Sequence, residues 1–437
     1  MKNKRVFKTI ISTIEKSFTR LPDYRRGVNT QYEIKDAAVA AFSVFFTQAP
    51  SFLASQRLQK NKKGKSNLEK LFGVENIPTD KQVKSLLDPI SSSFLYSLFW
   101  ETHELLEENS ILKKYRSYMG QILISNDGTE TISSQKLHCQ NCSHRELRNG
   151  KTQYFHSVLL PVIVKAGMSR VLPLPPEFIS PQDGHKKQDC EREATKRWVK
   201  RSAEYLRGWR YTMLGDDLYS NQPLCETFLE AELNFILVCK PDSHVELYKT
   251  VEFLAKNGLV EEVVVERHWN GRYYEKHIYR FVNNVPLRQE NPLMVNWLDM
   301  IVLRESTGKE EYHNSFVSNH KINSENVIPI AQDGRTRWKS ENETNNTLKN
   351  QGYNFEHNFG HGQAYLANFL ATLNLLAFLL HTLLDLLDEE YQLLRKTLVT
   401  RVEFFNDLRA LLRYMVFDSW EALMLFMLRS LDVPGYT

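Results

Sequence analysis

A long uncharged stretch near the C-terminal end of the chain constrains the fold more than any other feature. No Asp, Glu, Lys or Arg occurs from residue 360 to residue 384, and this span is long enough for a helix to cross a bilayer. The span nevertheless contains four polar side chains, those of Gln363, Asn368, Asn374 and His381. We therefore favour a helix buried in a protein core over a membrane-spanning helix.

The bulk composition is that of a folded protein. The chain has 437 residues, of which 42% are hydrophobic and 25% charged, and it is long enough for more than one domain. The formal net charge of +4 permits a nucleic-acid partner without demonstrating one. Five cysteines, an odd number, argue against a disulfide framework and fit a reducing cytoplasm. The basic N-terminal segment lacks the apolar core and cleavage site of a signal peptide.

The segment from residue 1 to about residue 115 is predicted to be helical. The run 32–46 is rich in Ala, Val and Phe, and Thr79 with Gln82 fits a capping box ahead of an apolar helix face. Between them lies the lysine-rich run QKNKKGKSN, residues 59–67. It is either a solvated loop or a contact to DNA phosphates, for which Lys62 and Lys63 are the candidates.

From about residue 121 the pattern changes to alternating strands and helices. QILISND (121–127), QYFHSVLLPVIV (153–164) and SRVLPLPPEFI (169–179) are predicted β-rich runs. A charged helix is expected over 188–206, the strand YTMLGDD over 211–217, a helix near 223–232 and the strand NFILVCK over 234–240. This texture predicts an α/β fold.

Residues 241–325 are predicted to form a β-rich insertion. VEEVVVERH and RYYEKHIYRFV flank Trp269-Asn270-Gly271, in which Asn-Gly is a hairpin turn signal. A second pair of strands, VNWLDMIVLRES and EYHNSFVSN, flanks residues 307–309. Trp269 at the first hairpin tip either stacks on an unpaired DNA base or anchors a core. Helical texture returns at about Val327 and continues to about Leu431.

Acidic residues follow two of the predicted strands. Asp127 ends ILISND, and Asp216 or Asp217 ends YTMLGDD, at the carboxyl ends of strands, where open α/β sheets bind ligands. A third acid lies in a predicted helix, one face of which holds Arg337, Glu341 and Asn345. Converging carboxylates can hold Mg²⁺, and two such ions stabilise both the attacking and the leaving oxygen of a phosphodiester displacement. Single acids of this kind are more often loop acids, so the order strand, strand, helix is the informative feature.

Three blocks of sequence surround these acids: ISNDGTE at Asp127, LGDDLYSNQPLCE at Asp216, and RWKSENETNNTLKNQGYNFEHNFGHG at Glu341. With IPTDKQVKSLLDPI and QDCEREATKRW, residues 77–90 and 188–198, they resemble bacterial insertion-sequence transposases of the DDE type, over nearly the whole chain. The resemblance implies a ribonuclease-H-like mixed sheet flanked by helices, with a β-rich insertion and helical N- and C-terminal regions. It also implies a metal site formed by the three acids.

Details of the blocks refine the candidate ligands. Tyr219 follows Asp216 at the family's spacing of three residues, which favours Asp216 over Asp217 as the second metal ligand. Glu343 is an alternative to Glu341 as the third ligand.

The family's signature around the third acid also names candidate DNA contacts. Arg337 matches it, whereas Lys349 lies one residue beyond the usual spacing and Gly334 stands where the family has Tyr. Arg337 and Lys349 are the residues that the resemblance assigns to DNA binding.

A Cys/His motif lies between the first two core strands. His138, Cys139, Cys142 and His144 form H-C-x-x-C-x-H, and zinc accepts two thiolates with two imidazoles. A zinc site usually joins two separated ligand pairs, so we favour a hairpin with incidental Cys and His and keep zinc as the alternative. His357 and His361, after the third acid, are either structural or contacts to DNA phosphates, and we favour a structural role.

The resemblance implies a DNA transposase that binds the terminal inverted repeats of a mobile element, cleaves the DNA and joins the ends to target DNA. The implied cofactor is Mg²⁺, for which Mn²⁺ can substitute. We expect a DNA-end-binding helical domain over 1–115, the catalytic core over 116–240 and 326–437 with C-terminal helices, and the insertion over 241–325. The expected partners are DNA and a second copy of the chain in the DNA complex, in the bacterial cytoplasm at the nucleoid, without a membrane. The alternatives are an inactive DNA-binding relic and a magnesium-dependent nuclease without strand transfer.

Overall fold

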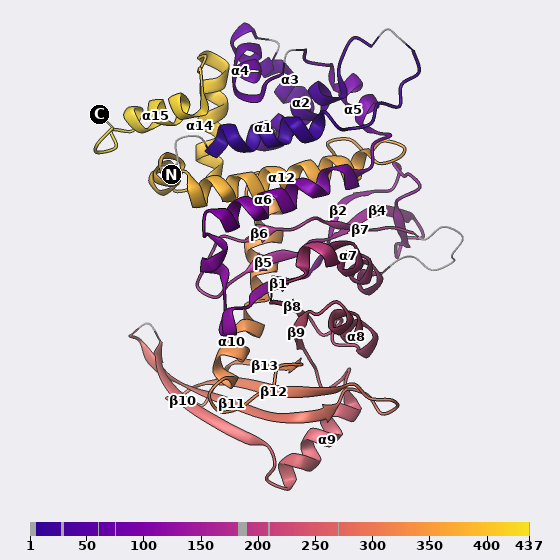
Figure 1. The fold of residues 1–437 in the computed structure, drawn as a ribbon, viewed down its shortest axis with the longest axis vertical. Coiled ribbons are helices and arrows are strands. Elements are labelled where there is room, and N and C mark those ends of the chain that lie inside the picture. The colour runs from indigo at the N-terminus through magenta and orange to yellow at the C-terminus, as the bar shows by residue number, and fades with distance from the viewer. Residues whose placement is uncertain are drawn as a thin grey trace.

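The computed structural model describes residues 6–27, 30–59, 61–74, 76–181, 190–208, 210–269 and 271–436. Helices from both ends of the chain gather at one end of an elongated molecule (Figure 1). A long mixed sheet runs from beneath these helices to the other end. The structure therefore belongs to the mixed α/β class that the sequence predicts.

The N-terminal part is helical, as predicted. Its elements are α1 (Val6–Phe18), α2 (Ile34–Phe46), α3 (Phe52–Gln59), α4 (Lys62–Phe72), α5 (Asp80–Leu87) and α6 (Tyr96–Glu108), with the short 3₁₀ helices η1 (Ser92–Leu95), η2 (Leu112–Tyr115) and η3 (Tyr118–Gly120). The capping box is confirmed, because Thr79 accepts from the backbone N–H of Gln82 and the Gln82 side chain reaches back to Thr79. Such a box satisfies two backbone N–H groups that the first helical turn leaves without partners.

The alternative of a loop at residues 59–67 is wrong for most of that run. Asn61 caps the start of α4 by accepting from the backbone N–H of Lys63, so Lys62 and Lys63 lie in the first helical turn. An Asn cap is a strong helix-start signal that the run of lysines obscured. Lys60 lies outside the described residues.

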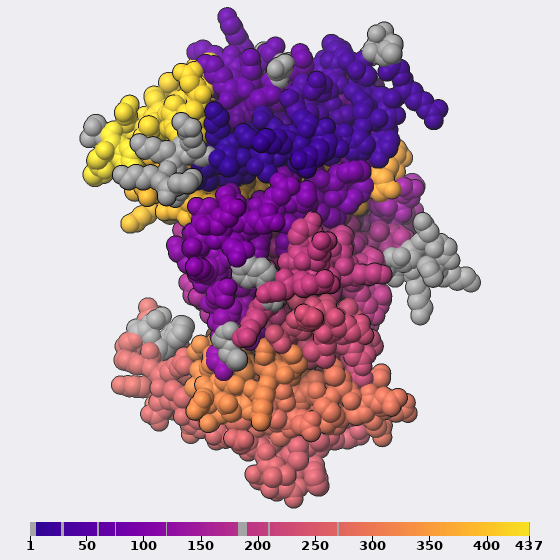
Figure 2. Space-filling view, viewed as in Figure 1, coloured from indigo at the N-terminus to yellow at the C-terminus, as the bar shows by residue number. Residues whose placement is uncertain are grey.

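The C-terminal helices pack directly against the N-terminal ones. They are α12 (Leu366–Leu387), α13 (Glu389–Thr397), α14 (Arg401–Tyr414) and α15 (Trp420–Ser430). Figure 2 shows the first and last parts of the chain gathered at the same end of the molecule. There the rings of Phe7 and Trp420 stack with centroids 4.6 Å apart, and Asn67 donates to the carbonyl of Leu412 at 2.9 Å. The two ends of the chain thus share one hydrophobic core.

The uncharged stretch forms the long helix α12, and its expected burial is confirmed. Of the described residues, only this helix is long and apolar enough to cross a membrane, and 83% of its most apolar window is buried inside the protein. Its polar side chains have partners there: Asn374 donates to the carbonyl of Tyr353 at 2.9 Å, and His381 Nδ1 lies 2.7 Å from the Tyr353 hydroxyl. Such bonds offset the cost of burying polar groups in a core.

Nine strands form the main sheet, in the order β10-β11-β12-β13-β9-β8-β1-β5-β6. Their bounds are β1 (Ile122–Ser125), β5 (Val162–Val164), β6 (Leu172–Pro173), β8 (Tyr211–Gly215), β9 (Asn234–Val238), β10 (Glu261–Trp269), β11 (Tyr273–Pro286), β12 (Met294–Arg304) and β13 (Glu310–Ser318). β8 is parallel to both β1 and β9, and the other neighbouring pairs are antiparallel. The helices around this sheet are α7 (Glu191–Leu206), α8 (Gln222–Glu230), α9 (Val245–Lys256) and α10 (Val327–Arg335).

A second, smaller sheet corrects two predicted strands. It consists of β2 (Gly128–Ser134), β3 (Ser143–Glu146), β4 (Thr152–Leu159) and β7 (Glu177–Ile179). The run 153–164 is not one strand, because it passes from β4 in the small sheet to β5 in the main sheet. The run 169–179 likewise divides into β6 and β7. Pro161 lies between β4 and β5, where its missing backbone N–H prevents a continuous strand ladder. The apolar pattern of the run does not show that its two halves belong to different sheets.

The four strands expected between residues 241 and 325 are present, together with α9. They continue the main sheet, because β13 pairs with β9 with Phe316 opposite Val238. The first pair is the predicted hairpin, in which Trp269 pairs with Tyr273. This hairpin lies at the edge of the sheet, far from the N-terminal helices (Figure 1).

Candidate active site

Asp127 and Asp216 leave the main sheet at the same edge. β1 and β8 are adjacent and parallel, and Ser125 pairs with Leu214 near their carboxyl ends. Asp127 follows Ser125 by two residues, as Asp216 follows Leu214. The strands are in register, so the two acids emerge together, and the charge of Asp216 raises the pKa of Asp127. This is the strand edge at which open α/β sheets bind ligands.

Glu341 lies in a π-helical segment, Ser340–Asn345, which leads into α11 (Asn346–Asn350). Its carboxylate is 66% exposed and lies 4.0 Å from the guanidinium of Arg337, one turn earlier. The negative charge of Glu341 also raises the pKa of Asp127, so the third predicted acid lies close to the first. Short π-helical turns are frequent at functional sites.

Two hydrogen bonds fix the π-helical segment against the end of β1. The hydroxyl of Ser125 donates to the backbone carbonyl of Arg337 at 3.3 Å. The side-chain amide of Asn345 donates to Asp127 Oδ2 at 2.6 Å. These contacts orient the Asp127 carboxylate and join residues more than two hundred positions apart in the chain.

A fourth acid, Glu191, completes the cluster, and the residue patterns did not single it out as a ligand. It is the first residue of α7, and the hydroxyl of Tyr219 donates to its Oε1 at 2.6 Å. Its other oxygen lies so close to Gly128 that a Cβ there would be 2.5 Å from it. Burial is the main cause that raises the pKa of Glu191, and Asp216 raises it further. The only sequence signal for Glu191 is its place in the block QDCEREATKRW.

The four carboxylates form an electronegative site. The pKa of Asp127 rises to about 6, first because the side chain is buried and then because Glu191, Glu341 and Asp216 are negative. The positive charge of Arg337 opposes this shift. A buried carboxyl whose pKa is raised by neighbouring carboxylates is common at sites that bind a cation or transfer protons.

The neighbouring acids Asp216 and Asp217 have different surroundings. The Asp217 carboxylate accepts from the backbone N–H of Lys240 at 2.6 Å and from the hydroxyl of Ser243, and it lies 3.5 Å from His244 Nε2. It therefore holds the turn after β9. Asp216 accepts from the backbone N–H of Leu218 at 2.9 Å, and its charge acts on Asp127 and Glu191 instead.

Two further candidates from the sequence, Glu343 and Lys349, form ion pairs with other residues. Glu343 lies 3.8 Å from the ammonium of Lys339, within the π-helical segment. Lys349 pairs with Glu356 at 2.7 Å. Of the two DNA contacts that the resemblance assigns, only Arg337 is among the charges that act on the pKa of Asp127.

The remaining candidate DNA contacts lie away from the carboxylates. Lys62 and Lys63 begin α4 among the N-terminal helices, and the Lys63 ammonium donates to the carbonyl of Tyr414 at 2.6 Å (Figure 1). Trp269 ends β10, an edge strand of the main sheet, and its side chain lies outside the described part of the chain.

The zinc-ligand set kept as the alternative shares only its two cysteines with the group that the structure brings together. His138 stacks on Tyr154 with ring centroids 4.7 Å apart, and His144 lies 6.3 Å from the same ring. Cys139 and Cys142 instead face His156 on β4 and His361, which precedes α12. His156 lies on a strand 14 residues after Cys142, and His361 lies 219 residues after it. The spacing within the C-x-x-C motif therefore did not reveal either histidine.

No protein-family model matches this chain, and a search of curated proteins finds no match either.

Proposed function

We propose that this protein is a DNA transposase of the DDE type, which cleaves the ends of a mobile element and joins them to target DNA. Asp127, Asp216 and Glu341 are the proposed metal ligands and catalytic residues. The observation that carries the proposal is that Asp127 and Asp216 follow adjacent parallel strands in register, and that the charges of Asp216 and Glu341 both raise the pKa of Asp127.

The strand order supports a ribonuclease-H-like core. In the run β6-β5-β1-β8-β9, the first three strands form an antiparallel meander and β8 and β9 are parallel to β1. Under this proposal β1 and β8 are strands of the ribonuclease-H-like core that the resemblance implies, and Asp127 and Asp216 follow them. The strands β10–β13 would then be the insertion between the second Asp and the Glu.

The donor set fits Mg²⁺, with Mn²⁺ as a substitute. Carboxylate oxygens are the ligands that these hard cations prefer. The pKa of Asp127 is raised to about 6, so a cation bound nearby would stabilise the ionised form of this carboxyl. When bound, two such ions supply charge stabilisation to the attacking and leaving oxygens of a phosphodiester. Within the protein, Asn345 orients the Asp127 carboxylate and Tyr219 orients that of Glu191.

A basic cavity beside the π-helical segment suits a DNA backbone. Its volume is about 690 Å³, and Glu343 and Thr347 form part of its wall. Its cationic lining residues are Lys114, Arg170, Arg395, Lys396 and Arg401, against two acids, Glu343 and Asp385, of which Asp385 pairs with Arg170 at 2.7 Å. The three proposed ligands do not line it, and the chain that carries Glu341 reaches it through Glu343 and Thr347. Phosphate neutralisation by such side chains supports binding to terminal repeats and to target DNA, in a complex that we propose contains two copies of the chain.

The test is magnesium-dependent cleavage of a plasmid that carries the element's ends. Asp127→Asn, Asp216→Asn and Glu341→Gln keep the side-chain size but remove a charge, so each should reduce cleavage by at least about a hundredfold. Asp217→Asn is the matched control and should retain far more activity than Asp216→Asn, since Asp217 serves the turn after β9. Full cleavage by the Asp127 or Glu341 variant would contradict the proposed mechanism.

A strand-transfer assay with pre-cut ends separates the proposal from its alternatives. Joining of the ends to target DNA supports a transposase. Cleavage without joining would indicate a magnesium-dependent nuclease. Binding of the ends without cleavage in either metal would indicate an inactive relic.

A further inference from the structure

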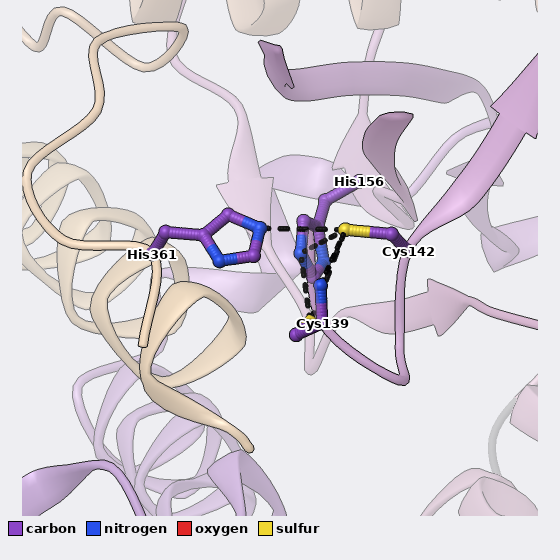
Figure 3. A group of neighbouring side chains, drawn as sticks. All are labelled: Cys139, Cys142, His156 and His361. Carbon is purple, nitrogen blue, oxygen red and sulfur yellow. Dashed lines mark hydrogen bonds between the residues drawn. The ribbon is translucent and has the colours of Figure 1, made fainter. Parts of the chain in front are cut away.

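Four metal-binding side chains from three separate segments meet beside the small sheet (Figure 3). Cys139 and Cys142 come from the loop before β3, His156 from β4, and His361 from the segment before α12. One ligand atom from each lies within 4.8 Å of all the others. Cys142, His156 and His361 are buried, and Cys139 is partly buried.

The distances between these atoms match those around one tetrahedral zinc ion. Bonds of about 2.3 Å to sulfur and about 2.0 Å to nitrogen separate two sulfurs by about 3.8 Å, and a sulfur from a nitrogen by about 3.5 Å. The two Sγ atoms are 3.9 Å apart. His156 Nε2 lies 3.5 Å from Cys139 Sγ and 3.3 Å from Cys142 Sγ, and His361 Nε2 lies 3.3 Å from Cys142 Sγ.

The other ring nitrogen of each histidine already has an acceptor. His156 Nδ1 lies 3.1 Å from the side-chain carbonyl oxygen of Asn368, on α12, and His361 Nδ1 lies 3.0 Å from the backbone carbonyl of Gly362. A proton on Nδ1 satisfies both contacts and leaves the Nε2 lone pair directed at the sulfurs. Zinc-bound histidines almost always have such an oxygen partner on the second nitrogen.

We propose that Cys139, Cys142, His156 and His361 bind one structural zinc ion. Four protein ligands complete a tetrahedral shell and leave no position for water or substrate, which is the property of structural rather than catalytic zinc sites. The two thiols release their protons to solvent when they bind the metal. The sulfur donors exclude the magnesium of the carboxylate site as the occupant, because hard cations prefer oxygen.

The zinc ion would connect parts of the chain that are 219 residues apart, from Cys142 to His361. A 2.6 Å hydrogen bond from the Asn141 amide to the carbonyl of Ala364 joins the same parts. The small sheet begins at Gly128, directly after Asp127, and His361 follows the segment that carries Glu341. If the proposed function holds, the ion therefore connects the part of the chain that follows Asp127 to the part that follows Glu341.

The test begins with the unaltered full-length protein, purified under reducing conditions without chelators or an affinity metal. Elemental analysis should find about one zinc per chain. Replacement of zinc by Co²⁺ should produce the visible absorption of a tetrahedral site with two thiolates and two imidazoles. Neither measurement depends on DNA cleavage, so the outcome is independent of the proposed function.

Two sets of variants locate the site. Cys142→Ser and His361→Asn should each lower the zinc content to below about a tenth of the wild-type value. His138→Ala and His144→Ala are the matched controls from the same segment and should keep the full content. If a ligand variant fails to fold, the cobalt spectrum of the unaltered protein still decides the proposal.

Three outcomes would overturn it. The first is zinc-free protein with unaltered thermal stability after chelator treatment. The second is loss of zinc from the His138 or His144 variant but not from the His361 variant. The third is a thiol count showing that Cys139 and Cys142 form a disulfide in the reduced, freshly purified protein.

Discussion

Replacing Asp127 by Asn is expected to stabilise the metal-free protein while it abolishes cleavage. Burial and three nearby carboxylates raise the pKa of Asp127 from 3.8 to about 6. At about 1.4 kcal/mol per pH unit, this difference makes the ionised side chain destabilising by up to about 3 kcal/mol near neutral pH. Asn removes the charge, and its carbonyl oxygen can still accept the hydrogen bond from Asn345. Sites selected for activity commonly trade stability in this way.

The pH dependence gives the prediction its sign. Above about pH 6 the Asp127 carboxyl is ionised in both the folded and the unfolded protein, so the full penalty applies. As the pH falls from about 6 towards 3.8, the folded protein takes up the proton first and the penalty disappears. The stability advantage of Asp127→Asn should therefore be largest above pH 6 and should shrink as the pH falls below it.

Urea unfolding in magnesium-free buffer at pH 7.5 and pH 5 measures this difference. Added Mg²⁺ should raise the unfolding free energy of the wild type more than that of Asp127→Asn. The reason is that the bound cation offsets the negative charge of Asp127, which the variant lacks. Asp217→Asn is the control with the opposite sign, since it weakens the bonds to Lys240 and Ser243 and should destabilise the protein. A variant Asp127→Asn that is less stable than the wild type at pH 7.5, or an advantage equal at both pH values, would refute the reasoning.

Three further predictions follow from the positions of other residues. Glu191→Gln should lower cleavage and raise the magnesium concentration needed for half-maximal cleavage, because it removes one of the four carboxylate charges. A magnesium titration that matches the wild type would exclude Glu191 from the site. Trp269→Ala should slow cleavage of intact ends more than cleavage of pre-nicked ends if the ring stacks on a displaced base, whereas equal slowing would indicate a folding role. The double variant Lys62→Ala/Lys63→Ala should bind end DNA more weakly, and the slope of log affinity against log salt should fall by about two when measured by fluorescence anisotropy. An unchanged slope would show that neither lysine contacts a phosphate.

The sequence alone predicted those features that depend on neighbours along the chain. Thr79 and Gln82 form a capping box because both partners lie in one helical turn. The strands that precede Asp127 and Asp216 were evident because a buried strand needs an apolar run. Residues 360–384 predicted a buried helix, since a long segment without charges is costly to leave in water.

Tertiary structure decided which side chains meet. Local pattern did not show that Glu191 joins the carboxylates, since it starts a helix outside the strand ends and reaches the site only when its side chain meets Gly128 and Tyr219. It also did not show that His156 and His361, rather than His138 and His144, face the two cysteines. These partners come from distant segments, and their positions depend on sheet register and helix packing. Such contacts form only when the whole core is assembled, so no spacing within one segment encodes them.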